Sequence, residues 1–170
     1  MTLLVVAGTF LLMEPATYVV HRWVMHGAAR RLHRSHHRWG SEGFELNDWF
    51  PVLFATLGML AFAAGASVGS LHVLVAVSLG SAAYGAAYAF VHDLYIHRRL
   101  PWLSFEWRPL ERLKAAHRVH HLFNGEPYGM LVPVVPAELR RRAASASTDP
   151  FPPARRPARG SVPSHVPVEA

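Results

Sequence analysis

The chain has 170 residues, enough for one domain and a tail. Hydrophobic residues make up 51% of it and charged residues only 16%, a balance that argues against a water-soluble globular protein. It contains no cysteine, which excludes disulfides, iron–sulfur clusters and thiolate-bound haem. Any electrons for redox chemistry must therefore come from another protein or from an added reductant.

The formal net charge is +6, and the basic residues are concentrated at 22–38, 98–118 and 140–159. Each cluster flanks or follows an apolar segment, whereas the link at 66–72 carries no Lys or Arg. This is the charge pattern of membrane proteins whose basic loops stay in the cytoplasm. The basic clusters adjoin apolar segments rather than forming a patch with exposed aromatic residues on a folded soluble surface, so we predict no nucleic-acid partner.

The first apolar run, at 2–20, has near-membrane length and no basic segment before it, which predicts a retained transmembrane helix rather than a signal peptide. Glu14 interrupts this run, and a carboxylate in a membrane segment is costly unless it has a function. It precedes His21 by seven residues and so shares its helix face. We expect Glu14 either to accept a hydrogen bond from a metal-binding histidine or handle protons, or to lie hydrated at the interface.

Residues 21–49 are polar and basic. Asn47 and Asp48 close this segment, directly before Trp49, which is suited to the membrane interface. Asp48 is expected to cap the following helix or to hold a histidine, and capping is the commoner role.

Two further apolar runs follow, at 52–66 and 71–91. The first reaches membrane length only if residues 49–51 lie at the interface, whereas the second is long enough alone. Small residues at 80–87 would allow another helix, or a flat rigid ligand, to approach closely, and we expect helix packing.

The C-terminal part is predicted to lie on the membrane surface. Residues 100–116 combine aromatic and basic side chains, as in an interfacial amphipathic helix or loop. Residues 123–129 are rich in turn formers and are expected to close a metal site from the aqueous side. From about residue 143 no hydrophobic period remains, so we predict a membrane domain at 1–142 and a disordered tail at 143–170 that could attract anionic lipid weakly.

Ten of the twelve histidines fall into four blocks. A pair spaced i, i+5 is followed by a triplet spaced i, i+3, i+4, and this order occurs twice. The blocks are His21 and His26; His33, His36 and His37; His92 and His97; and His117, His120 and His121. On a helix the i, i+3 and i+4 positions share one face, so each triplet can converge on a point. The i, i+5 pairs lie about 140° apart on an ideal helix, which requires the helix to end, loosen or bulge, and we expect an end.

Neutral imidazole binds iron, copper, zinc and nickel, and ten imidazoles exceed what one ion can hold, so two metal ions fit the count better. We expect His72 and His165, outside the blocks, to have ordinary roles. Histidines that share a metal must lie on one side of the membrane. Two apolar runs separate the second block from the third, and the other intervals between blocks are polar. All four blocks therefore fall on the basic, cytoplasmic side, with about three crossings and the N-terminus outside.

This order of histidine blocks on a small apolar chain resembles the fatty acid hydroxylase and sterol desaturase superfamily, and within it the bacterial β-carotene hydroxylase branch. The resemblance covers roughly residues 10–135. The matching stretches are Met13-Glu14-Pro15, His21-Arg22-Trp23-Val24-Met25-His26-Gly27, Leu32-His33-Arg34-Ser35-His36-His37, Phe44-Glu45-Leu46-Asn47-Asp48, Phe90-Val91-His92-Asp93 and His117-Arg118-Val119-His120-His121. The chain departs from the family after His92-Asp93, where Leu94 replaces an expected glycine. This departure changes no histidine of the predicted metal site, so it concerns which substrate the protein would accept.

The resemblance implies an all-α integral membrane bundle of three to four transmembrane helices that holds two iron ions (Fe²⁺) at a histidine-rich, cytoplasmic-side site. It implies a mono-oxygenase that uses dioxygen and hydroxylates the β-ionone ring, converting β-carotene to zeaxanthin through β-cryptoxanthin. It further implies a ferredoxin-type electron donor with its reductase. Asp93, like Glu14, becomes a candidate hydrogen-bond partner of a metal-binding histidine.

Two alternatives remain open. The same di-metal site could hydroxylate or desaturate another lipid, such as a fatty acyl chain or a sterol. A non-catalytic membrane metal carrier or sensor would also use histidines, but it would not explain their repeated spacing. Transporters moreover usually place their ligands near the middle of the bilayer rather than at helix ends.

Overall fold

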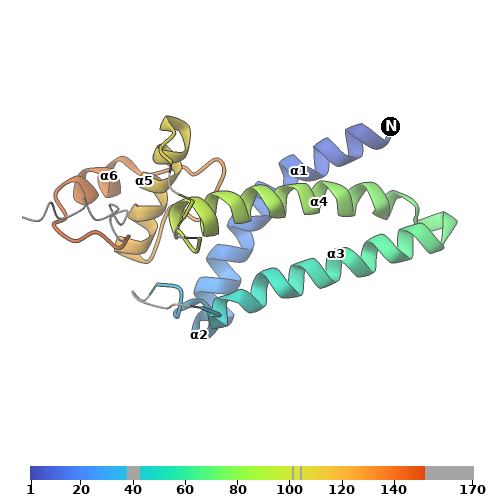
Figure 1. The fold of residues 1–170 in the computed structure, drawn as a ribbon, viewed down its shortest axis with the longest axis horizontal. Helices are drawn as coiled ribbons and strands as arrows, with labels where there is room; N and C mark the ends of the chain where they lie inside the picture. The colour runs from blue at the N-terminus through green and yellow to red at the C-terminus, as the bar shows by residue number, and fades with distance from the viewer. Residues whose placement is uncertain (38–42, 101, 104, 152–170) are drawn as a thin grey trace, which may run out of the picture.

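The computed structural model describes residues 1–37, 43–100, 102–103 and 105–151, and all regular structure in these ranges is helical (Figure 1). The α-helices are α1 (Thr2–Val19), α2 (Arg30–His33), α3 (Trp49–Ser67), α4 (Val73–Ala89), α5 (Arg108–Phe123) and α6 (Ala137–Ala144). Two π-helices, η1 (Val20–Ala28) and η4 (Phe90–Ile96), continue α1 and α4, and the 3₁₀ turns η2 (Leu46–Asp48) and η3 (Gly69–Leu71) precede α3 and α4.

Three segments of the described chain are long and apolar enough to cross a membrane: Thr2–Ala28, Leu46–Ser67 and Val73–Ile96. Large apolar side chains on these helices, such as Leu11, Leu57 and Leu60, are exposed in the isolated chain, as lipid-facing residues would be. The prediction of an all-α membrane bundle is confirmed, with three candidate spans. As expected, the second span extends past its apolar run to include Trp49.

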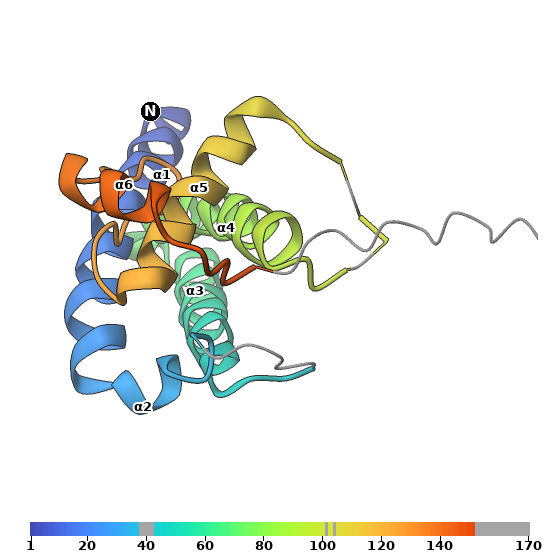
Figure 2. The same ribbon diagram turned by 90° about the vertical axis from the view of Figure 1, so that its left-hand side faces the viewer.

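The polar elements gather at one end of the bundle. The N-terminus and the α3–α4 connection lie at the opposite end from α2, α5 and α6 (Figure 1). A view onto that end shows α2, α5 and α6 around the ends of the long helices (Figure 2). All four histidine blocks belong to this end, which agrees with an odd number of crossings between the N-terminus and the histidines.

Glycine allows the long helices to pack closely. A Cβ built on Gly80 would lie 2.5 Å from the Val6 carbonyl oxygen and 2.7 Å from the Thr9 Cβ, so the α4 backbone rests directly on α1. A Cβ on Gly65 would lie 2.9 Å from the Val75 nitrogen, where α3 turns into α4. The small-residue stretch is therefore used for helix packing at Gly80, whereas a Cβ on Gly85 would meet nothing within 4 Å.

We expected the helix to end between the two histidines of each pair, and it does not. Instead it widens into a π-helix over both pairs, and i→i+5 hydrogen bonds bring residues five apart onto nearly one face. The His97 amide donates to the His92 carbonyl at 2.9 Å, which closes this turn directly between the two histidines. In η1 a bond of the same i→i+5 kind runs from the Ala29 amide to the Val24 carbonyl at 2.7 Å, and it spans Gly27, whose backbone is not helical.

The start of the predicted tail has a defined structure. Helix α6 continues to Ala144, and Phe151 is only 3% exposed within an apolar cluster that includes Ile96 and Met130. The described part of the predicted tail therefore contacts the domain through Phe151, and the boundary at residue 142 stays a prediction. The remainder of the predicted tail, 152–170, lies outside the described residues.

Candidate metal centre

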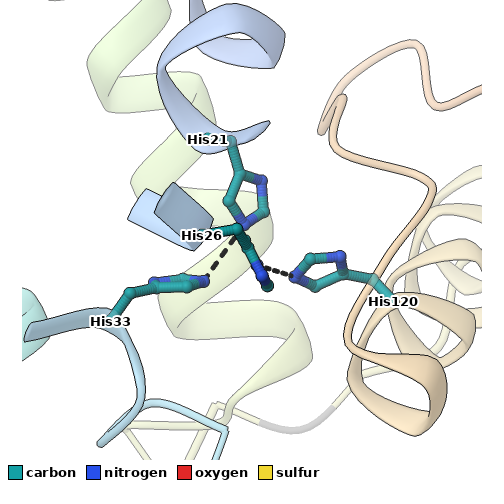
Figure 3. A group of neighbouring side chains, drawn as sticks. All are labelled: His21, His26, His33 and His120. Atoms are coloured by element: carbon teal, nitrogen blue, oxygen red, sulfur yellow. Dashed lines mark hydrogen bonds between the residues drawn. The ribbon is translucent and has the colours of Figure 1, made fainter. Parts of the chain in front are cut away.

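The first group of histidines brings together three segments of the chain. His21 and His26 lie on η1, His33 on α2 and His120 on α5, and Figure 3 shows the four rings pointing toward one another. One ring nitrogen of each lies within 4.8 Å of the others, a spacing that could hold a metal ion. His120 has no exposed surface, and His21 and His33 are buried.

The second group also consists of four histidines, one i, i+5 pair and one residue from each triplet. His92 lies on η4 and His97 directly after it, His117 lies on α5, and His36 follows α2. Their ring nitrogens also lie within 4.8 Å of one another.

His37 and His121 connect the two groups. The His37 Nε2 lies 3.1 Å from the His33 Nε2, and the His121 Nε2 lies 2.9 Å from the His117 Nε2. The rings of His37 and His121 stack on each other with centroids 4.3 Å apart. All ten block histidines thus form one continuous cluster.

Each triplet divides its side chains between the two groups. His33 joins the pair that precedes it on η1, and His117 joins the pair that precedes it on η4. The middle histidines cross over, so that His36 joins the η4 pair and His120 the η1 pair. This exchange links the N-terminal half of the chain to the C-terminal half through the site itself.

Hydrogen bonds orient several of these rings through Nδ1. His21 donates to the Tyr128 carbonyl at 2.9 Å, His120 donates to the Gly125 carbonyl, and His33 contacts Asn47 Oδ1 at 2.7 Å. A metal-binding histidine usually donates its other ring N–H in this way, which fixes the tautomer and directs the free nitrogen toward the metal. A fourth ring, that of His92, contacts the Asp93 carboxylate at 2.7 Å, whereas Nδ1 of His36 lies 3.6 Å from Glu45, beyond hydrogen-bond distance.

The facing Nε2 atoms provide a test of whether a metal fits. His21 and His33 approach each other at 3.1 Å through Nε2, a contact drawn in Figure 3, yet both place their proton on Nδ1. Two lone pairs then face each other, which is unfavourable unless a cation lies between them. Imidazole nitrogens about 2.1 Å from a shared ion are separated by about 2.9–3.4 Å, so this contact and the 3.2 Å between His26 and His120 suit a metal.

An unpaired polar atom supports the same conclusion. Nε2 of His36 is buried without a hydrogen-bond partner in the described structure. A buried nitrogen without a partner is costly, and coordination by a metal would satisfy it.

Burial also keeps the imidazoles in the form that binds metals. It lowers the pKa of His33 from 6.5 to about 3 and that of His37 to about 2, because a charged ring would lose its hydration. For the same reason the pKa values of His97, His117 and His120 are held well below 6.5. These histidines are therefore neutral at physiological pH, as metal ligation requires.

Glu14 serves a purpose that the sequence did not suggest. Its carboxylate accepts hydrogen bonds from the amides of Met130, Leu131 and Val132 at 2.9–3.1 Å and from the Tyr84 hydroxyl at 2.6 Å. The described hydrogen bonds of Glu14 thus come from Tyr84 and from the backbone that follows the fourth block rather than from a histidine. This backbone continues from Gly125 and Tyr128, whose carbonyls hold His120 and His21.

Asp93 contacts His92 at 2.7 Å, and its role as the partner of a metal-binding histidine stays a prediction. Asp48 accepts the Glu45 amide at 2.8 Å in a capping box at η2 and pairs with Arg99 at 2.9 Å. Its side chain makes no capping hydrogen bond to α3, the helix that we expected it to cap. The sequence does not indicate the contact between Asn47 and His33, although Asn47 stands directly before Asp48.

A polar cavity of about 340 Å³ opens onto the cluster from one side. His26, His37 and His121 line it together with the exposed Arg30 and Arg34. The residues that line it include no carboxylate.

Comparisons with known proteins agree with this geometry. A family model described as fatty acid hydroxylase matches residues 6–135. A β-carotene hydroxylase of Paracoccus sp. (strain PC1) is 39% identical over 127 residues, which cover 74% of this chain and 77% of the relative. A β-carotene hydroxylase of Pseudescherichia vulneris is 36% identical over 145 residues, which cover 81% and 80%.

A β-carotene 3-hydroxylase of Arabidopsis thaliana chloroplasts is 37% identical over 120 residues, covering 66% of this chain and 38% of the longer plant protein. No solved structure matches the chain. The matched residues include all four histidine blocks, and the chain belongs to the fatty acid hydroxylase family.

Proposed function

We propose that this protein is a membrane di-iron mono-oxygenase that hydroxylates the β-ionone ring of β-carotene, giving zeaxanthin through β-cryptoxanthin. The observation that carries the proposal is the convergence of ten histidines in two linked groups of equal composition. The names of the bacterial relatives supply the substrate.

One metal ion would be held by the first group together with His37, and the other by the second group together with His121. The first set is His21, His26, His33, His37 and His120; the second is His36, His92, His97, His117 and His121. Bound iron would supply the activation of dioxygen, one atom of which enters the C–H bond as hydroxyl while the other leaves as water, with two electrons and two protons consumed. Imidazole ligands suit iron, although they also suit zinc and copper.

The chain's own groups divide the remaining tasks. Contacts to Nδ1 fix the orientation of four imidazole rings: His21 through Tyr128, His120 through Gly125, His33 through Asn47 and His92 through Asp93. The three apolar spans would place the site beside the bilayer, from which a hydrophobic substrate could reach it. The polar cavity beside His26 and His37 offers the aqueous side a path for protons and electrons.

The chain has no cysteine with which to hold an iron–sulfur cluster of its own, and we propose that a ferredoxin-type donor with its reductase supplies the electrons. Arg30 and Arg34 at the cavity would attract an acidic donor. Turnover with that donor should fall as salt increases and in the Arg30→Glu variant, but not in Arg140→Glu on α6. Turnover independent of salt and of Arg30 would contradict docking at this cavity.

We place the histidine end on the cytoplasmic side of the membrane. The basic segments that surround the histidines support this orientation, as do the three candidate spans. Labelling of single cysteines, introduced near the N-terminus and beside α6 of this cysteine-free chain, would test it in intact cells.

Expression in a bacterium that accumulates β-carotene tests the substrate. Zeaxanthin or β-cryptoxanthin should appear with the intact chain and not with His36→Ala, as measured by chromatography and mass spectrometry. Unchanged β-carotene beside a metal-loaded protein would remove the carotenoid assignment and direct attention to fatty acyl chains and sterols.

A further inference from the structure

Phe151 lies beyond the family match, which ends at residue 135, yet it contacts the histidine cluster. Its ring is parallel to that of His117 within 5°, with centroids 5.9 Å apart, and it meets His97 at 5.3 Å and His121 at 5.2 Å. All three histidines belong to the half of the cluster built around His36 and His92.

Arg118 holds the segment that carries Phe151. Its guanidinium donates to the carbonyls of Ala143 at 3.0 Å and Thr148 at 2.8 Å, and it pairs with Asp149 at 3.4 Å. Asp149 in turn accepts the Phe151 amide at 3.1 Å. Since Arg118 directly follows His117 on α5, the segment is fastened beside the histidines that it covers.

The two halves of the cluster therefore differ in their surroundings. The half with His26 and His33 opens onto the polar cavity. The other half is covered by Phe151, whose neighbours in the apolar cluster are Val91, Ile96 and Met130. His121 lies at the boundary, because it both lines the cavity and contacts Phe151.

We propose that residues 143–151 complete the metal centre, with Arg118 positioning Phe151 as an apolar wall that keeps water from the His36, His92, His97 and His117 site. An apolar shell around a metal controls the access of solvent. The ion in this half should then exchange with solution slowly, whereas the ion beside the cavity should exchange faster. Phe151 would also prevent water from reaching the reaction from this side.

The inference rests on the proposed di-metal centre, and metal release tests it without carotenoid. Purified protein loaded with cobalt(II) is mixed with a chelator, and cobalt absorbance is followed. The intact chain should lose its two ions in two phases. Phe151→Ala should accelerate the slower phase by about 10-fold or more and leave the faster phase unchanged. Phe151→Leu retains apolar bulk and should restore most of the slow release.

Two further variants separate this effect from general loosening. Phe62→Ala makes the same change on the membrane helix α3, where Phe62 is exposed, and should release metal as the intact chain does. Asp149→Ala retains the Phe151 side chain but removes the carboxylate that pairs with Arg118 and accepts the Phe151 amide. Because Asp149 is an exposed residue, this variant should fold normally and accelerate the slow phase to a smaller extent.

Equal release from the intact chain, Phe151→Ala and Asp149→Ala would overturn the inference. A chain that binds no cobalt would instead count against the proposed metal centre, so the two failures are distinguishable. If Phe151→Ala does not fold, the Asp149→Ala result decides.

Discussion

Asn47 Oδ1 lies 2.7 Å from Nδ1 of His33, and both side chains are buried. This contact joins the turn before α3 to the histidine on α2. It directs the His33 Nε2 toward both His21 and His37, at 3.1 Å each. A residue that is not a metal ligand thus determines how the ring that connects three histidines is oriented.

Replacing Asn47 should weaken metal binding while the fold is retained. Asn47→Ala removes the acceptor of His33, and the loss of such a partner typically lowers metal affinity about 10–100-fold. Asn47→Asp keeps an oxygen in place and should retain most of the affinity. Metal titration of both variants checks this, and equal affinity for Asn47→Ala and the intact chain would contradict it.

Glu14→Gln should destabilise the protein by about 2–3 kcal/mol, because hydrogen bonds to a charged group are stronger than average and an amide nitrogen would face backbone donors. Gly129→Ala should also destabilise it, since a Cβ there would lie 2.8 Å from Glu14 Oε1. Gly125→Ala is the matched control, because its Cβ would meet nothing closer than 3.8 Å. Thermal unfolding in detergent measures all three, and a Gly129→Ala midpoint equal to that of Gly125→Ala would refute the anchoring role.

The α1–α4 contact predicts opposite effects of one substitution at two glycines of α4. Gly80→Ala should destabilise the bundle by about 1–3 kcal/mol, because the added methyl overlaps the Val6 carbonyl. Gly85→Ala adds the same methyl in open space and should be neutral or stabilising by up to about 1 kcal/mol. Similar unfolding midpoints for both variants would show that the helices do not approach at Gly80.

The metal-free protein should lose stability as the pH falls from 6.5 toward 3. In this window the unfolded chain protonates His33, whose pKa is then 6.5, while the folded chain keeps it neutral because burial lowers its pKa to about 3. The unfolded state thus binds more protons, and His33 alone should cost about 2 kcal/mol at pH 5. His37 acts in the same direction. Unfolding midpoints between pH 8 and 5 test this, and a His33→Gln chain should show a weaker dependence.

Sequence alone predicted the bundle and the histidine set because both depend on local patterns. Apolar runs of membrane length indicate spans such as Val73–Ile96, and the repeated spacing of His117, His120 and His121 indicates convergence. The parity of crossings then required all blocks to lie on one side of the membrane, and the structure brings the ten histidines together.

The rest depends on contacts between residues far apart in the chain. Glu14 and Met130 are 116 positions apart, and no periodicity links them. Phe151 follows a stretch whose composition indicates disorder, yet a single arginine and an apolar cluster fix it in place. The π-helices could not be distinguished from helix ends, because both solve the same geometric problem for residues five apart.

Iron content per chain tests the central claim most directly. It should be measured on purified protein that converts β-carotene, with iron determined by mass spectrometry and protein by amino-acid analysis. We predict about two irons per active chain, in keeping with a ten-histidine set, and fewer in both His36→Ala and His120→Ala, the two histidines that cross between the groups. An active chain with one iron or none would contradict the account.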